Sequence, residues 1–284
     1  MTRAQAAPAA PSAGSDIPLS SAVFADIAQR VYALTGIVLK EHKRQMVCTR
    51  LTKRLRVLQL ASFEAYLAYL AGPDAKEEVG ELINAITTNL TSFFRESHHF
   101  DHLRDEVVRP LMDKGAQRLR IWSAGCSTGE EPYTIQMTLD ELGALKRKWD
   151  YKLLATDLDS AVLARAAAGR YNAERFAQMD AGLQKRHFTA QSDGSFEVQP
   201  ALRDQIRFRQ LNLLENWPFG GPFDAIFCRN VLIYFDAETK AGLIDRFAEK
   251  LTKDGALYLG HSESLLGEHK ALKALGRTIY RRKP

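Results

Sequence analysis

The residues with the clearest potential for chemistry lie where an apolar run gives way to small residues and then to acids. Residues 120–124 are apolar enough for a buried strand, 125–129 carry two glycines, and 130–132 read Glu-Glu-Pro. Glycines let a backbone approach a ligand closely, and proline is tolerated in the first turn of a helix. This order of strand, tight loop and helix predicts a nucleotide-type binding loop, although such a turn can also be purely structural.

Two acids limit what this loop can bind. Glu130 and Glu131 would repel a pyrophosphate at a helix N-terminus, which otherwise attracts anions. A cationic, hydroxyl-rich ligand such as S-adenosylmethionine fits better. Asp157 ends the next apolar run, 153–157, where the ribose-binding carboxylate of a doubly wound sheet lies. We therefore predict a methyltransferase core that uses S-adenosylmethionine.

Two later apolar runs also end in polar side chains. Arg229 and Asn230 follow the run 223–228, with Tyr234 shortly after them, and Asn212 follows the run 206–211. The carboxyl ends of parallel strands line the ligand crevice of such a sheet, so we expect these residues there. Asn212 either hydrogen-bonds an adenine edge or only forms a turn.

Two further segments have a functional and a structural interpretation. In 88–96, Phe93 and Phe94 stand beside Arg95, either as part of the site or as a hydrophobic anchor for a linker. The helix expected around 47–58 carries several basic residues, of which Arg50, Lys53 and Arg54 can share one face. That face is either solvated or binds an acidic partner.

The elements that must position these residues divide the chain in two. Apolar residues at helical spacing predict helices at about 20–36, 47–58, 62–72 and 76–87, which form a small all-helical domain at 17–88. Residues 1–16, rich in Ala, Pro, Ser and Gly, are expected to be a disordered tail.

Beyond a linker at 89–105, strands and helices alternate, which favours a mainly parallel sheet covered on both faces at 106–284. Strands are expected at 119–124, 151–156, 206–211, 223–228, 255–260 and 277–282, and helices at 131–146, 159–168 and 237–251. A hairpin at 187–198, turning at 192–195, is expected within a small antiparallel β insertion at 171–205. The fold class is therefore α/β and Rossmann-like, preceded by helices.

Composition excludes several classes of protein. The chain has 284 residues, of which 45% are hydrophobic and 26% charged, as in an ordinary globular protein. No apolar run approaches the roughly 18–20 residues that span a bilayer, and the start does not read as a secretory signal, so a cytoplasmic location is expected. Cys48, Cys126 and Cys228 lack the spacing of a zinc site or a disulfide framework, and no metal is expected.

Taken together, the motifs resemble the chemotaxis receptor glutamate methyltransferases of the CheR type, from about Ser20 to the C-terminus. The matching segments, in chain order, are Asn-Leu-Thr-Ser-Phe-Phe-Arg at 89–95, Trp-Ser-Ala-Gly-Cys-Ser-Thr-Gly-Glu-Glu-Pro-Tyr at 122–133, Ala-Thr-Asp-Leu-Asp at 155–159, Cys-Arg-Asn-Val-Leu-Ile-Tyr-Phe-Asp at 228–236 and Gly-His-Ser-Glu at 260–263. Members of this family O-methylate glutamates of bacterial chemoreceptors with S-adenosylmethionine and release S-adenosylhomocysteine.

The resemblance implies a role for each matching residue. Arg95 and Tyr234 would lie near the transferable methyl group as catalytic residues. The residues implied for cofactor binding are Asn89, Thr91, Arg95, Ala124, Glu130, Asp157, Asn212, Leu213, Arg229 and Asn230. The basic helix, through Arg50, Lys53, Arg54 and Arg56, would face the acidic methylation region of the receptor's cytoplasmic coiled coil.

Some members also hold the receptor's C-terminal pentapeptide on a small β subdomain. Its counterpart here is the short hairpin around 192–195, whose brevity does not favour such tethering. Because a glutamate with a pKa of about 4.3 is already ionised at pH 7, the reaction requires no general base, and no catalytic His–Asp pair is expected.

Two rival functions remain. The basic pI of about 9.0 and net charge of +5 suit a nucleic acid methyltransferase, but no Asp/Asn-Pro-Pro-Tyr-like segment and no Arg- and aromatic-rich strand platform is present. A cofactor-binding scaffold without turnover is the second, and Arg95, Asp157 and Tyr234 argue against it.

Overall fold

The computed structural model describes residues 17–73, 75–177, 179–265 and 267–284. The tail expected at 1–16 lies outside the described residues. The chain divides into two compact units, with the boundary between Thr88 and Asn89. Among the described residues, no helix has both the length and the apolar character needed to cross a bilayer.

The first unit is all-helical, as the apolar spacing predicted. Its helices are α1 (Ser21–Thr35), α2 (Arg44–Val57), α3 (Phe63–Leu70) and α4 (Ala75–Ile86), with a short 3-10 turn, η1 (Glu41–Lys43), before α2. Ser20 and Ser62 cap α1 and α3, since each hydroxyl accepts a hydrogen bond from the backbone N–H three residues on. Gly36 ends α1 in the left-handed region, at φ 71°.

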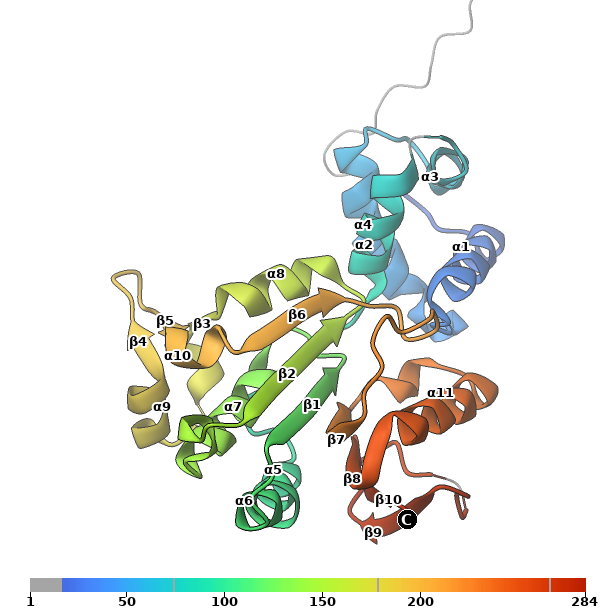
Figure 1. Ribbon diagram of the computed structural model, residues 1–284. Helices are drawn as coiled ribbons and strands as arrows, with labels where there is room; N and C mark the ends of the chain where they lie inside the picture. The colour runs from blue at the N-terminus through green and yellow to red at the C-terminus, as the bar shows by residue number, and fades with distance from the viewer. Residues whose placement is uncertain (1–16, 74, 178, 266) are drawn as a thin grey trace, which may run out of the picture. The chain divides into compact units, whose positions relative to one another are not determined.

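The second unit is built on a seven-stranded mixed sheet in the order β6-β2-β1-β7-β8-β10-β9 (Figure 1). The strands are β1 (Arg118–Ala124), β2 (Asp150–Asp157), β6 (Ile206–Gln210), β7 (Phe223–Cys228), β8 (Leu251–Leu259), β9 (Leu272–Gly276) and β10 (Ile279–Arg282). The first five are parallel to one another, and β10 runs antiparallel to β8 and β9. The strand order reverses between β1 and β7, which is where ligands bind in sheets of this type.

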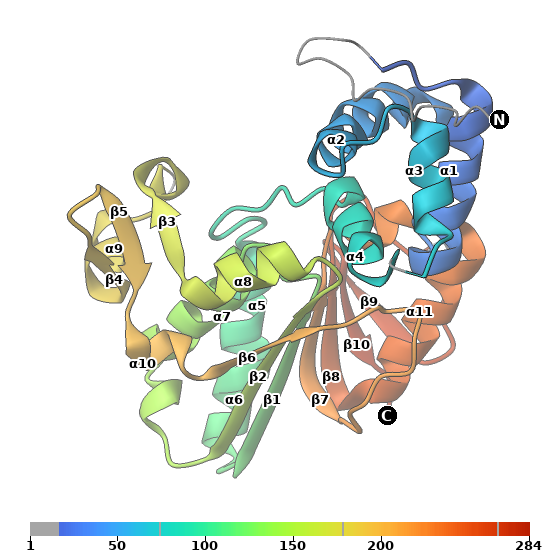
Figure 2. The ribbon, with the colours of Figure 1, turned by 90° about the horizontal axis from the view of Figure 1, so that it is seen from above.

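Helices cover both faces of this sheet, so its central strands, such as β1 and β7, are largely buried on both sides. Figure 2 shows α7 (Glu130–Glu141) and α8 (Ser160–Ala168) on one side and α11 (Ala237–Lys250) on the other. Neighbouring residues of β1 point to opposite cores: Ile121 packs on the first side, and Trp122 packs with Phe247 of α11 on the second. The expected Rossmann-like α/β fold is confirmed.

The segment 89–105, which the sequence predicts to be a linker, is helical in its second half. Residues 98–113 are one helical stretch, made of α5 (His98–His102), a π-helical turn η2 (Leu103–Val108) and α6 (Arg109–Asp113). Phe100, Leu103 and Val107 are buried at helical spacing against the same side of the sheet as α7. Residues 93–97 form turns, so linker backbone without regular structure is confined to the residues before Phe93.

Three element boundaries also differ from expectation. The helix expected at 131–146 ends at Glu141, because Gly143 adopts φ 76° and a 3-10 turn, η3 (Ala144–Lys146), follows. Strand β8 begins at Leu251, ahead of the expected 255. Strand β9 was missed, since the two-residue turn to β10 uses Arg277 (φ 49°) and Thr278 (φ 60°) in place of the usual Gly or Asn.

The β insertion is present as a three-stranded antiparallel sheet in the order β3-β5-β4. The predicted hairpin is formed by β4 (Phe188–Ala190) and β5 (Ser195–Val198), while β3 (Arg170–Asn172) was not anticipated. Two short helices, η4 (Ala173–Phe176) and α9 (Ala181–His187), lie between β3 and β4, and α10 (Pro200–Arg203) leads back to the main sheet.

Candidate functional site

The loop after β1 has the tight geometry that its sequence predicts. The N–H groups of Gly125 and Cys126 both donate to the carbonyl oxygen of Thr156, at 2.7 and 2.9 Å. Gly125 adopts φ 99°, and a Cβ there would lie 2.3 Å from Cγ2 of Val231. Only glycine tolerates both this φ and this close approach. The position therefore brings the loops that follow β1, β2 and β7 together.

Asp157, at the end of β2, organises the neighbouring loops. Its Oδ2 accepts a hydrogen bond from Ser127 N (2.8 Å) and its Oδ1 from Asp159 N (3.0 Å). The residue is 9% exposed, and burial raises the pKa of its carboxyl from 3.8 to about 6. A carboxylate held in this way can accept hydrogen bonds from the hydroxyls of a ribose.

Asn89 ties the start of the linker to both loops. Its Nδ2 donates to Asp159 Oδ2 at 2.8 Å, and its carbonyl accepts a hydrogen bond from Ser127 Oγ at 3.2 Å. Sequence reasoning did not assign a role to Asp159, although it stands in the segment 155–159. Thr91, two residues further on, accepts a hydrogen bond through its carbonyl from Arg175 Nη1 at 3.0 Å.

Glu130, at the start of α7, provides a test of whether the residues fit the predicted cofactor. Its side chain is fully buried, its Oε2 accepts a hydrogen bond from Thr128 Oγ1 at 2.7 Å, and Arg175 Nη1 lies 3.5 Å from Oε1. Oε1 accepts no hydrogen bond from the described part of the chain. Burial raises the pKa of this carboxyl. A buried acceptor without a donor, beside a glycine loop, fits a ligand that presents hydroxyl or ammonium groups.

The side chain of Arg229, at the end of β7, is directed at protein groups. Its Nη1 lies 3.0 Å from Glu131 Oε2, its Nη2 donates to the carbonyl of Arg95, and the residue is 6% exposed. Glu131 in turn accepts a hydrogen bond from Ser123 Oγ at 2.7 Å. Sequence reasoning used Glu131 only to exclude phosphate and missed this pairing.

Asn230 and the turn after it are held by another acid that was missed, Glu263. Its Oε2 accepts from Asn230 N (2.7 Å) and Gly260 N (2.6 Å), and its Oε1 accepts from Ile233 N (3.1 Å). Asn230 adopts φ 59°, in the left-handed region. Tyr234 ends the 3-10 turn η5 (Leu232–Tyr234) that follows and is half-buried. Glu263 lies in the segment 260–263, the only sequence signal for it.

The residues after β6 form a turn. Asn212 Oδ1 accepts a hydrogen bond from Leu214 N at 3.1 Å, as a turn-forming asparagine does. Leu213 is buried, and its carbonyl accepts hydrogen bonds from Trp217 Nε1 and Arg246 Nη1. The structural interpretation of the Asn212 side chain is thus observed, and a contact with an adenine stays a prediction.

The two aromatic residues before Arg95 serve as an anchor. Phe93 is 5% exposed, and its ring centroid lies 5.0 Å from that of Tyr171 and 5.4 Å from that of Phe176, in the β insertion. Arg95 itself is partly exposed, and its Nη1 donates to the carbonyl of Leu90 at 2.9 Å. The anchor fixes the segment from which Arg95 extends.

The four basic residues of α2 differ in their surroundings within the helical unit. Arg50 donates to the carbonyls of Ala85, Ile86 and Thr87 at the end of α4, at 2.8 to 3.2 Å. Arg54 pairs with Glu78 at 2.6 Å and with Glu81 at 3.1 Å. Lys53 and Arg56 are exposed. The guanidinium groups of Arg50 and Arg54 therefore bind α4, and the exposed cations of this set are Lys53 and Arg56.

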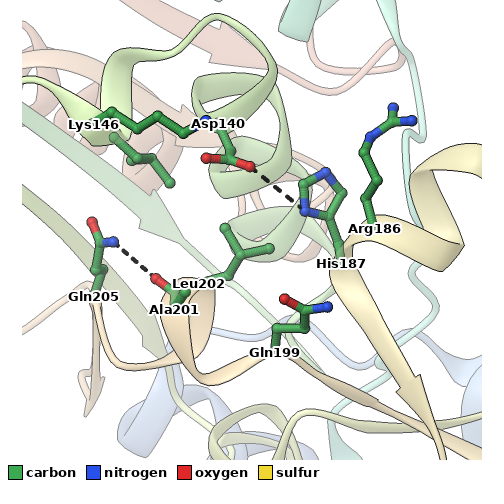
Figure 3. Close-up of a pocket in the computed structure, with 9 residues that line it drawn as sticks. Asp140, Lys146, Arg186, His187, Gln199, Ala201, Leu202 and Gln205 are labelled. Atoms are coloured by element: carbon green, nitrogen blue, oxygen red, sulfur yellow. Dashed lines mark hydrogen bonds and ion pairs between the residues drawn. The ribbon is translucent and has the colours of Figure 1, made fainter.

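A cavity of about 240 Å³ lies near the amino ends of β2 and β6 (Figure 3). Lys146 and Gln205, which precede β2 and β6, line it together with Asp140 and His187. Ligand-type atoms of Asp140, Glu141 and His187 lie within 4.8 Å of one another, but Arg186 donates two hydrogen bonds of 2.9 Å to Glu141. This cluster is an ion-pair network that joins α7 to α9.

The glycine loop after β1, the buried Asp157 at the end of β2 and the Glu130 oxygen that accepts no hydrogen bond from the described residues stand together at the topological switch point. The fold and these groups define the class of protein: a methyltransferase that uses S-adenosylmethionine.

Comparison with known proteins identifies the family. The family models described as "CheR methyltransferase, all-alpha domain" and "CheR methyltransferase, SAM binding domain" match residues 22–87 and 89–281. Chemotaxis protein methyltransferase 2 of Pseudomonas aeruginosa is 44% identical, with 90% of this chain and 91% of that protein covered. The Escherichia coli chemotaxis protein methyltransferase is 42% identical (93% and 92% covered), and a probable one of Rhizobium etli is 41% identical (88% and 96%). The chain belongs to the CheR methyltransferase family.

Proposed function

We propose that this protein forms methyl esters on glutamate side chains in the cytoplasmic domain of methyl-accepting chemoreceptors. The names of its relatives, chemotaxis protein methyltransferases, support the receptor as acceptor. The observation that carries the choice of glutamate is Arg95, a partly exposed guanidinium whose single hydrogen bond among the described residues goes to a backbone carbonyl. Its Nε lies 3.9 Å from Glu96 Oε1, and a guanidinium can bind a further carboxylate through its remaining N–H groups.

S-adenosylmethionine, when bound, supplies a methyl group activated by a sulfonium and leaves as S-adenosylhomocysteine. Asp157 binds the ribose, and Glu130 accepts a hydrogen bond through Oε1. Arg95 orients either the substrate glutamate or the carboxylate of the cofactor, and Tyr234 positions the reacting groups by its hydroxyl or ring face.

A general base is not needed in this reaction. The substrate glutamate is ionised at pH 7, and a positive and a negative charge are neutralised as the ester forms. Water solvates both charges and so opposes the reaction, and a pocket that excludes water assists it.

The receptor-binding surface within the helical unit is assigned to Lys53 and Arg56, whose charges are exposed. Arg50 and Arg54 support this surface indirectly, because they hold α2 against α4. The acidic methylation region of a receptor coiled coil complements such a surface. The β insertion offers only short strands, and we do not assign pentapeptide tethering to it.

The test is transfer of labelled methyl from S-adenosylmethionine to the cytoplasmic fragment of a bacterial chemoreceptor, with DNA and RNA as parallel acceptors. Label on the receptor that mild base releases as methanol is the expected result, since esters hydrolyse and N-methyl groups do not. Stable label on nucleic acid would overturn the proposal in favour of the nucleic acid alternative. Binding of S-adenosylhomocysteine without transfer to any acceptor would favour a scaffold.

A further inference from the structure

The backbone around Arg95 adopts an unfavourable conformation. Phe94 and Glu96, on either side of Arg95, have φ values of 53° and 55°. Side chains with a Cβ rarely adopt this region, and a segment with two such residues persists only where its surroundings fix it. The position of the Arg95 side chain therefore depends on the groups that hold this backbone.

Two contacts hold it from the body of the domain. Phe94 N donates to Thr134 Oγ1 of α7 at 3.2 Å, and the carbonyl of Arg95 accepts a hydrogen bond from Arg229 Nη2. The carboxylate of Glu96 lies 3.7 Å from the same Arg229 nitrogen. Although burial opposes ionisation, Arg229 and a hydrogen bond from His261 lower the pKa of Glu96, so this residue is charged at neutral pH.

Arg229 is itself fixed by a buried partner. Its side chain is 3% exposed, Glu131 Oε2 lies 3.0 Å from Nη1, and its guanidinium carbon lies 5.3 Å from the ring centre of Phe100. The hydroxyl of Ser123 holds the other oxygen of Glu131. A chain of polar contacts thus runs from β1 through α7 and β7 to the backbone of Arg95. Buried ion pairs add little net stability, so stability alone does not explain this one.

We propose that Arg229 and Glu131 are positioning residues for methyl transfer, which act by holding the strained backbone that presents Arg95. The inference rests on the proposed function, because it takes Arg95 as a group that contacts substrate or cofactor. It assigns the two terminal nitrogens of Arg229 a task other than contact with the adenosine, since both are engaged by protein groups, whereas the buried Nε donates to no group of the described residues.

A double-mutant cycle tests this proposal. Arg229→Lys keeps the charge but cannot donate to Glu131 and to the Arg95 carbonyl with one planar group. We expect this variant to lower kcat about tenfold or more, because a small misplacement of a catalytic group has effects of this size. The affinity for S-adenosylhomocysteine, measured by calorimetry, is expected to change by less than about threefold. In an Arg95→Ala background the same substitution is expected to lower kcat less than about twofold.

Two further variants are matched to this one. Glu131→Gln keeps the shape of the side chain and is expected to give the same pattern more weakly. Arg120→Lys is the control, since Arg120 also donates to a backbone carbonyl and a carboxylate, but at Leu119 and Asp150, where β2 begins. It is expected to leave kcat and cofactor affinity unchanged.

The outcomes separate the possible roles. Equal losses in kcat with and without Arg95 would show that Arg229 does not act through Arg95, and the proposal would be wrong. A large loss of affinity for S-adenosylhomocysteine with kcat retained would make Arg229 a cofactor contact and would also overturn it.

Hydrogen exchange requires no methyl acceptor, so it tests the positioning role even if the protein does not methylate a receptor. Hydrogen exchange of the amides of 92–97 is expected to become faster in Arg229→Lys and Glu131→Gln, while exchange of the strand amides stays unchanged. Unchanged exchange in this segment would contradict the positioning role, whatever the acceptor proves to be.

Discussion

At the scale of single residues, four buried acids of this site differ in their partners. Asp157, Glu130, Glu131 and Glu263 are all buried, and burial raises the pKa of each. Their partners differ: backbone N–H groups surround Asp157 and Glu263, Arg229 pairs with Glu131, and one oxygen of Glu130 accepts no hydrogen bond from the described residues. Under the roles proposed above, the same residue type serves in structure, positioning and binding.

Asp157 predicts a pH dependence of cofactor binding. Its pKa in the folded protein is about 6, above the usual 3.8, so the folded protein retains a proton that the unfolded chain releases. The free energy of unfolding therefore loses a contribution as pH rises from about 4 to 6. The ionised carboxylate is the better acceptor for ribose hydroxyls, and cofactor affinity should weaken by up to about tenfold per pH unit below 6.

Calorimetry with S-adenosylhomocysteine between pH 5 and 8 measures this effect. In Asp157→Asn the affinity should be weaker at pH 7 and flat across the window. A pH profile in the variant identical to that of the wild type would assign the titration to another group, of which Glu130 is the first to examine.

Arg95 and Tyr234 predict losses of turnover without losses of stability. Both are partly exposed, so Arg95→Ala and Tyr234→Phe remove no buried packing. We expect each to lower kcat by about 10- to 1000-fold while thermal unfolding stays within about 2 °C of the wild type. A variant with wild-type methylation rates would lose its assigned role.

At the scale of elements, the loops after β1 and β7 approach each other closely where Gly125 meets Val231. Gly125→Ala would place a Cβ 2.3 Å from Cγ2 of Val231 at a φ of 99°. We expect it to reduce the free energy of unfolding by about 2–4 kcal/mol and to weaken cofactor binding. Gly143→Ala is the matched control, with φ 76° but no heavy atom within 4 Å of the added Cβ, and should cost about 1 kcal/mol.

The double variant Gly125→Ala/Val231→Ala separates the steric clash with Val231 from the backbone strain at a φ of 99°. Removing the Cγ atoms of Val231 should recover part of the loss if the clash matters. No recovery would leave backbone strain as the whole cause.

The basic residues of α2 are expected to differ in their effect on stability. Arg50→Met removes three hydrogen bonds to the end of α4 and should reduce the free energy of unfolding by about 1–3 kcal/mol in urea titrations. Lys53→Met, on the exposed face of the same helix, should change it by less than about 0.5 kcal/mol. Equal stabilities of the two variants would contradict the structural role of Arg50.

At the scale of the whole molecule, charge predicts how the acceptor is recognised. The net charge is +5, and Lys53 and Arg56 are exposed cations. The double variant Lys53→Glu/Arg56→Glu should raise the KM for a receptor fragment several-fold at low salt, and added salt should narrow the difference. Affinity for S-adenosylhomocysteine should not change, because this surface is in the helical unit. An unchanged KM would remove α2 from the receptor-binding surface.

The amino-acid sequence by itself determined most of the architecture. Periodicity and turn residues gave the four helices of the first unit, the parallel strands and the hairpin of the β insertion, because these depend on local patterns. It did not reveal β9, whose turn at Arg277 and Thr278 carries no Gly or Asn, or the helix at 98–113, which begins within a segment interpreted as a linker.

For the site, the sequence marked Asp157 at a strand end and Glu130 at a helix start, and the family resemblance implied the roles of Glu130 and Arg95. Only the tertiary structure decided their partners. Arg229 is 98 residues from Glu131 and 134 from Arg95, and Glu263 is 33 from Asn230. Such pairings are set by which strands lie side by side and by which buried groups lack other partners. No spacing along the chain encodes that information.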